Sequence, residues 1–117
     1  MITIMPADKA FLQEIGAADG VDAMVLRDSS GSVDGYALFR ADGNFVELLA
    51  VKTDLPMMGE GLIRSVLNTG DCRGAVKGIC YDHSLATTLR RLEFEEENGA
   101  WTVSIEKFFR GDCKCGK

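Results

Sequence analysis

One stretch of this sequence decides the fold that it predicts: Val46-Glu-Leu-Leu-Ala-Val-Lys-Thr-Asp-Leu-Pro-Met-Met-Gly-Glu-Gly-Leu-Ile-Arg-Ser-Val-Leu67. Its first six residues are mostly apolar and predict a strand. Gly59 and Gly61 then predict a turn, and a helical spacing of apolar residues starts at Leu62 and stops at Gly70. Glycines allow close backbone approach, and the first amides of a helix attract negative charge. This strand, glycine turn and helix are therefore typical of an anion-binding site.

Two motifs that the stretch lacks narrow the kind of anion. The Lys-Ser/Thr pair that ends a phosphate loop is missing, and so is the three-glycine fingerprint of dinucleotide-binding folds. Nucleoside triphosphates and NAD are therefore poorer candidates for this site.

The segments before this stretch predict an N-terminal part made mostly of strands. The expected elements are a strand at residues 2–5, a helix at 8–16, and strands at 23–27, 33–41 and 45–51. Asp8 is expected to cap the helix, and Gly16 is expected to stop it. Turn formers at residues 28–32 predict that the strands on either side of them form an antiparallel hairpin.

The segments after this stretch predict a buried strand, a helix and then two further strands. The expected elements are a buried strand at residues 75–81, a helix from about residue 84 to 92, and strands at 94–97 and 100–108. Asn98-Gly99 is a preferred pair for a type I′ turn, so the last two strands are expected to form a hairpin. Leu85, Leu89 and Leu92 are expected to face inward from the helix.

Together these elements predict an α+β fold, with a mixed, mainly antiparallel sheet and helices on both faces. A length of 117 residues, 46% of them hydrophobic, suits one domain, expected at residues 1–110. Residues 111–117 show no apolar periodicity and are expected to form a flexible, cysteine-containing tail.

Charge and composition exclude some classes of function. A net charge of -5 argues against a nucleic-acid partner, because such surfaces gather Lys and Arg. No apolar run approaches the roughly 20 residues of a membrane helix, and the first residues do not resemble a signal peptide. We therefore expect a cytoplasmic protein with no membrane partner. Its four cysteines are expected to be free thiols.

Three segments carry a resemblance to a known family: Glu47-Leu-Leu-Ala-Val51, Pro56-Met-Met-Gly-Glu-Gly61 and residues Leu85 to Phe94. They resemble the fourth strand, the Arg/Gln-x-x-Gly-x-Gly/Ala pyrophosphate loop and the helix before the Gly-Phe corner of the GCN5-related N-acetyltransferase (GNAT) family. Order and spacing agree over most of the chain. The resemblance implies an acyl-CoA N-acyltransferase fold, acetyl-CoA as cofactor, and transfer of its acetyl group to an amine of a small molecule or peptide.

The resemblance also implies which residues would meet the cofactor. Its pyrophosphate would be held by backbone amides of the loop, with Leu62 opening the helix: Met57, Met58, Gly59, Glu60, Gly61 and Leu62. Its thioester carbonyl would be polarised by backbone N–H groups on the strand before the loop, at Leu49, Ala50 and Val51.

Departures from the family pattern bear on activity. Pro56 stands where the family carries Arg or Gln, and it offers no N–H. Leu89 stands where many members carry the tyrosine that protonates the departing thiolate, and Glu93 replaces the glycine of Gly-Phe. The region before Ala23 is short for the family. Acceptor recognition is therefore expected to be reduced or supplied by a partner chain, and a homodimer is one such arrangement.

Catalysis needs a base for the amine and an acid for the leaving thiolate. Glu47 is the candidate base, because the family often places a catalytic Glu on this strand; an ordinary exposed strand carboxylate is the alternative. Tyr81 is the candidate acid, and surface packing is its alternative. His83, the only histidine, is read more simply as a surface residue at a helix entry.

Two other functions stay open. A degenerate GNAT-like domain would keep the fold and act as a CoA-binding or protein-interaction module, which Pro56 and Leu89 favour. Cys113-Lys-Cys115 offers two thiolates at a chelating spacing, but Cys72 and Cys80 have no Cys-x-x-Cys partner. No metal site is therefore expected.

Overall fold

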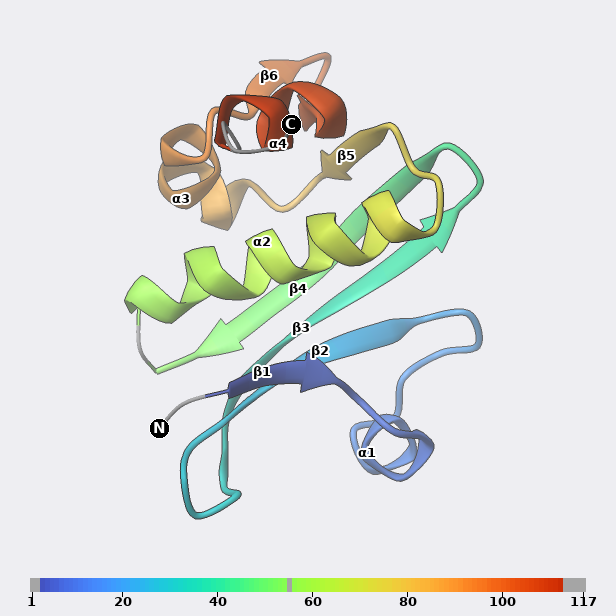
Figure 1. Ribbon diagram of the computed structural model, residues 1–117, viewed down its shortest axis with the longest axis vertical. Helices are drawn as coiled ribbons and strands as arrows, with labels where there is room; N and C mark the ends of the chain where they lie inside the picture. Colours follow the sequence, from blue (N-terminus) through green and yellow to red (C-terminus); the bar gives the residue numbers. More distant parts are fainter. Residues whose placement is uncertain (1–2, 55, 113–117) are drawn as a thin grey trace.

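The computed structural model describes residues 3–54 and 56–112, and it has one mixed sheet flanked by helices (Figure 1). Seven strands are ordered β1-β2-β3-β4-β5-β7-β6. Along the chain the elements are β1 (Thr3–Pro6), α1 (Lys9–Glu14), β2 (Asp22–Arg27), β3 (Val33–Asp42), β4 (Phe45–Thr53), α2 (Pro56–Cys72), β5 (Lys77–Cys80), the 3-10 helix η1 (His83–Leu85), α3 (Ala86–Arg91), β6 (Glu95–Glu97), β7 (Ala100–Ser104) and α4 (Ile105–Asp112).

The N-terminal half confirms the elements expected there. Asp8 caps α1 by accepting a hydrogen bond from the N–H of Phe11 at 2.9 Å. Gly16 follows α1 with a φ of 71°, which favours glycine. Strands β1 to β4 form an antiparallel meander, and β5 then pairs parallel with β4.

Alternate residues of the same strands show which helices cover which face. On β2, Ala23 and Val25 pack in a small cluster with Phe11 of α1. Met24 and Leu26, which point to the opposite face, join the main core with residues of α2, α3 and α4. The predicted α+β class, with helices on both faces of a mixed sheet, is confirmed.

Helix α2 is longer at both ends than the sequence predicted. It begins at Pro56, not at Leu62, and ends at Cys72, not at Gly70. Gly70 is needed for close packing: a Cβ atom there would lie 2.9 Å from Cβ of Val46 on β4. The glycine therefore brings the helix down onto the sheet and does not end it.

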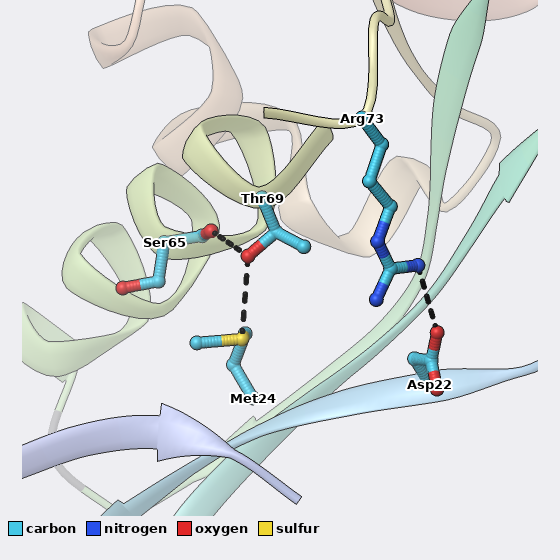
Figure 2. Close-up of polar contacts among 5 residues, drawn as sticks. All are labelled: Asp22, Met24, Ser65, Thr69 and Arg73. Atoms are coloured by element: carbon cyan, nitrogen blue, oxygen red, sulfur yellow. Dashed lines mark hydrogen bonds and ion pairs between the residues drawn. The ribbon is translucent and has the colours of Figure 1, made fainter. Parts of the chain in front are cut away.

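Polar contacts tie the C-terminal half of α2 to β2 (Figure 2). The Thr69 hydroxyl lies 3.0 Å from the carbonyl oxygen of Ser65 and 3.6 Å from Sδ of Met24. Just beyond the helix, Nη1 of Arg73 donates to Oδ2 of Asp22 at 2.9 Å, and its guanidinium lies 5.8 Å from the ring centroid of Phe39. These contacts fix the C-terminal half of α2 on the sheet.

The C-terminal hairpin is confirmed, but its second strand is shorter than predicted. Asn98 and Gly99 both have positive φ, at 53° and 84°, as a type I′ turn requires. Strand β7 ends at Ser104, and Ile105 begins α4, so the strand expected up to residue 108 was wrong. Residues 111 and 112 also belong to α4, and the rest of the predicted tail, 113–117, lies outside the described residues.

Candidate functional site

Strand β5 pairs with only the first part of β4, and this leaves a gap beside the second part of β4. Their parallel register runs from Phe45 opposite Lys77 to Leu48 opposite Cys80, where β5 ends. Strand β4 continues to Thr53. From Leu49 onward, the β5 side of β4 therefore has no strand partner among the described residues.

A bulge in β4 begins where this gap begins. Leu38 of β3 pairs with Ala50 while Phe39 pairs with Leu48, so Leu49 has no partner on β3. A bulge of this kind bends the strand and increases its twist. The bulge lies where β5 ends, at the start of the unpaired edge that carries the predicted carbonyl-binding residues, Leu49, Ala50 and Val51.

The N-terminus of α2 lies just beyond the end of β4. In an α-helix that begins at Pro56, the first-turn N–H groups without helical partners are those of Met57 and Met58, because proline has none. The side chain of Met57 is 79% exposed. Two backbone donors at the positive end of a helix therefore lie just beyond the end of β4, the strand that borders the gap.

The glycines of the predicted loop lie inside the helix. A Cβ on Gly59 would meet Val51 at 3.9 Å, and one on Gly61 would meet Ile4 at 3.4 Å, so both glycines face the sheet. Leu62 is fully buried. The expected turn was wrong because both glycines continue the helix, where a Cβ at either position would make only ordinary contacts with the sheet. The predicted pyrophosphate-binding role of Gly59, Glu60, Gly61 and Leu62 stays a prediction.

Glu47 lies at the inner end of the gap. It is the register partner of Arg40 on β3 and of Ile79 on β5. Its Oε1 lies 3.9 Å from Nη1 of Arg40, and its side chain is 24% exposed. The carboxylate is therefore restrained by a cation but still reaches solvent, as a base acting on a bound amine requires.

Cys80 and Tyr81 are the residues at which β5 ends. Burial raises the pKa of the Cys80 thiol, and the charges of Asp82 and Glu47 raise it further, which disfavours the thiolate that a nucleophile requires. Tyr81, the next residue, is 58% exposed. Ile79 opposes Glu47 in register, so Tyr81 leaves the strand two residues beyond the candidate base.

His83 has a structural explanation. The indole Nε1–H of Trp101 donates to Nδ1 of His83 at 3.2 Å. Because Nδ1 accepts, Nε2 carries the proton of the neutral ring and donates to the carbonyl oxygen of Gly99, 3.1 Å away. Both ring nitrogens are engaged, which favours the interpretation of His83 as a residue that joins η1 to the last hairpin.

The two other departures from the family pattern lie in and after α3. Leu89 is fully buried in the main core. Glu93 has a φ of 68°, and hydrogen bonds from Glu93 N–H to Arg90 and from Phe94 N–H to Leu89 complete the turn that ends a helix with a left-handed residue. The glycine-type corner is thus kept here without glycine.

No pattern in the sequence predicted a contact between Glu60 and Arg91. In the structure, Nε and Nη2 of Arg91 on α3 both contact Oε2 of Glu60 on α2, at 3.0 and 2.9 Å. The two residues are 31 positions apart in the sequence. This ion pair brings a cation beside the N-terminal part of α2.

Two further findings concern metals and membranes. Within residues 3–54 and 56–112, no three His, Cys, Asp or Glu side chains are grouped so that they could hold a metal ion, and Cys113 and Cys115 lie outside this part. Cys72 and Cys80 are free thiols, one exposed and one buried. Across the same residues, every helix is too short or too polar to cross a membrane.

Comparison with solved structures identifies the fold. A GNAT-family acetyltransferase from Staphylococcus aureus Mu50 is similar over 90% of this chain and 99% of its own, with a TM-score of 0.70 and 11% identity. A GNAT-family acetyltransferase from Elizabethkingia anophelis with acetyl-CoA bound is similar over 88% and 97% of the two chains, with a TM-score of 0.66 and 11% identity. The chain thus has the GNAT fold, as its resemblance implied.

A third similar structure is a complex of KacTA with DNA, which covers 96% of this chain and 98% of its own at a TM-score of 0.71 and 12% identity. The expected absence of a nucleic-acid partner therefore stays a prediction. No protein-family model matches the sequence, and no curated protein is similar to it.

Proposed function

We propose that this chain is an acyl-CoA-dependent N-acetyltransferase, which moves the acetyl group of acetyl-CoA to an amine of a small molecule or peptide in the cytoplasm. One observation carries the proposal: β4 runs on beyond its last pair with β5 and leads to the N-terminus of α2. The fold is similar to that of the acetyltransferases above, one of which has acetyl-CoA bound, and this supports the proposal that the gap and the helix N-terminus form one cofactor site.

The residues present fit an acyl-CoA. The open edge of β4 at Leu49, Ala50 and Val51 supplies backbone groups for the thioester end, and the amides of Met57 and Met58 supply donors for the pyrophosphate. Because Pro56 gives neither a side-chain donor nor an N–H, we expect weaker phosphate binding than an Arg or Gln there would give.

The cofactor would supply an activated acyl group, and the chain would supply proton transfer. We assign Glu47 as the base that takes a proton from the attacking amine, held in place by Arg40. The family's usual acid is a tyrosine, but Leu89 stands at that position here and is buried in the core. We therefore assign Tyr81 as the acid for the leaving thiolate. The acceptor is expected to be a small-molecule or peptide amine.

A second function is favoured by the burial of Leu89. A domain without an acid on α3 would bind CoA, or a protein, without catalysing transfer. We keep two expectations for both functions: no nucleic-acid partner, which the net charge of -5 supports, and a homodimer as one way to complete the acceptor side of the site.

The test is calorimetric titration of the purified protein with acetyl-CoA and, separately, with desulfo-CoA. Micromolar binding of both ligands supports the cofactor site, and an amine screen for acetyl transfer then separates the enzyme from the binding module. No binding at millimolar ligand would contradict the enzyme and the CoA-binding module, and it would leave the protein-interaction module as the remaining function.

A further inference from the structure

The ion pair between Arg91 and Glu60 lies within one helical turn of the proposed phosphate donors. Glu60 follows Pro56 by four residues and Met57 by three, so it occupies the same face of α2, about 5.4 Å further along the axis. Arg91 reaches this face from α3. Its side chain is 62% exposed, against 28% for Glu60, so the guanidinium lies at the surface and the carboxylate lies more deeply.

Other arginines nearby are held by aromatic rings. Arg90 lies 5.2 Å from the ring centroid of Trp101, and Arg64, one turn beyond Glu60 on α2, lies 5.3 Å from that of Phe108. Both nitrogens that Arg91 commits to Glu60 contact a single carboxylate oxygen. A guanidinium favours two parallel bonds to an anion, and a phosphate offers this geometry at least as well as a carboxylate.

We propose that Arg91 is a phosphate ligand of the bound acyl-CoA, and that Glu60 is an internal competitor that holds Arg91 when the cofactor is absent. This inference rests on the proposed function. Pro56 stands where the family carries Arg or Gln, so the phosphate site lacks a side-chain donor at that position. In this proposal Arg91 of α3 supplies the missing side-chain donor. The proposal also makes the affinity for the cofactor depend on a carboxylate that never touches it.

The experiment measures the dissociation constants of acetyl-CoA and of S-acetylpantetheine, which has no phosphate, for the full chain and its variants. Arg91→Gln is expected to weaken acetyl-CoA binding about tenfold and to leave S-acetylpantetheine binding unchanged. Glu60→Gln is expected to tighten acetyl-CoA binding about two- to fivefold, because an exposed ion pair no longer competes. In the double variant the gain from Glu60→Gln is expected to disappear.

Matched controls separate the exchange, in which Arg91 leaves Glu60 for a phosphate of the cofactor, from general effects of net charge or folding. Arg90→Gln removes one positive charge from the neighbouring position of α3, and Glu96→Gln removes one negative charge from an exposed strand at the sheet edge. Both are expected to leave acetyl-CoA affinity within about twofold of that of the wild type. Thermal unfolding of each variant shows whether the fold is intact.

The outcomes distinguish this inference from the function on which it rests. If the wild type binds acetyl-CoA but Glu60→Gln binds it no more tightly, or Arg91→Gln loses affinity equally for S-acetylpantetheine, the exchange is overturned and the cofactor site stands. If the wild type binds no acetyl-CoA at millimolar concentration, the proposed function and the exchange both fall.

Discussion

The two ends of α2 are held in different ways. At the C-terminal end, Gly70 brings the helix against Val46, and Arg73 bonds to Asp22 on β2. At the N-terminal end, Met57 is largely exposed, and the polar contact described is the ion pair between Glu60 and Arg91. One helix thus has an anchored end and an open end, and the open end is the one whose backbone donors lie just beyond the end of β4, the strand that borders the gap.

With its two ends held in different ways, one helix can contribute both to the stability of the domain and to a binding site. Close packing and hydrogen bonds stabilise a fold only where groups are buried and satisfied. Binding of an anion such as a phosphate instead needs hydrogen-bond donors that the protein itself does not use. Placing both on one rigid helix lets the anchored end position the open end.

The strongest change that we expect is in the rate of acetyl transfer, and it follows from replacing the candidate base beside the gap. Glu47→Gln is expected to lower kcat for acetyl transfer about 100-fold, because the amine loses its base, while the affinity for acetyl-CoA stays the same. Steady-state kinetics with a responsive amine, together with calorimetry, measures both. Equal rates for this variant and the wild type would remove Glu47 from the role of base; Glu96→Gln is the matched charge control.

At the anchored end, Gly70→Ala is expected to lower the free energy of unfolding by about 2 kcal/mol. The added Cβ would lie 2.8 Å from Cγ1 and 2.9 Å from Cβ of Val46, so helix and sheet must separate. Urea denaturation measures the change. A variant as stable as the wild type would show that the C-terminal half of α2 is not tightly anchored.

A glycine-to-alanine substitution at the open end is expected to change the free energy of unfolding in the opposite direction. Gly59→Ala should raise the free energy of unfolding by about 0.5–1 kcal/mol, because alanine favours the helix and its Cβ would meet Val51 at an ordinary 3.9 Å. The same urea measurement applies. A loss of stability here would mean that the first turns of α2 lie closer to β4 than the structure shows.

The smallest expected effect is that of the surface ion pair. Arg73→Met removes the guanidinium, and with it both the bond to Asp22 and the contact with the ring of Phe39, and it should cost about 0.5 kcal/mol, less at high salt. The side chains are 50% and 41% exposed, which is why the value is low. A double-mutant cycle with Asp22→Asn isolates the pair, and a coupling energy of zero would leave the anchoring to the packing at Gly70 and the contact between Thr69 and Met24.

Much of the fold could be predicted from local patterns. Apolar-rich runs and the turn formers between them predicted the β2–β3 hairpin, and Asn98-Gly99 predicted the β6–β7 hairpin. Both predictions succeeded because these signals act within a few residues. The start of α2 was missed because Gly59 and Gly61 are poor helix formers on their own, and packing against β4 and β1 outweighs that cost. Helix α4 was read as a strand, although Ile105, Phe108 and Phe109 follow the helical spacing of three and four.

The candidate site was less predictable than the fold. Glu47 and the strand edge follow from the resemblance, but the register that ends at Leu48 and Cys80 depends on how distant segments pair. The contact between Glu60 and Arg91 joins two helices and leaves no signal in either segment alone. Tertiary contacts of this kind require the structure.

Strand β6 carries Glu95, Glu96 and Glu97 and is one edge of the sheet, with all three residues exposed. An exposed edge can recruit a strand from another molecule and begin aggregation. If two copies met along this edge, their glutamates would lie about 4.8 Å apart across the new pair of strands. Repulsion between these charges therefore protects the domain from growing into larger sheets on that side, and it directs any edge-to-edge assembly of copies towards β1.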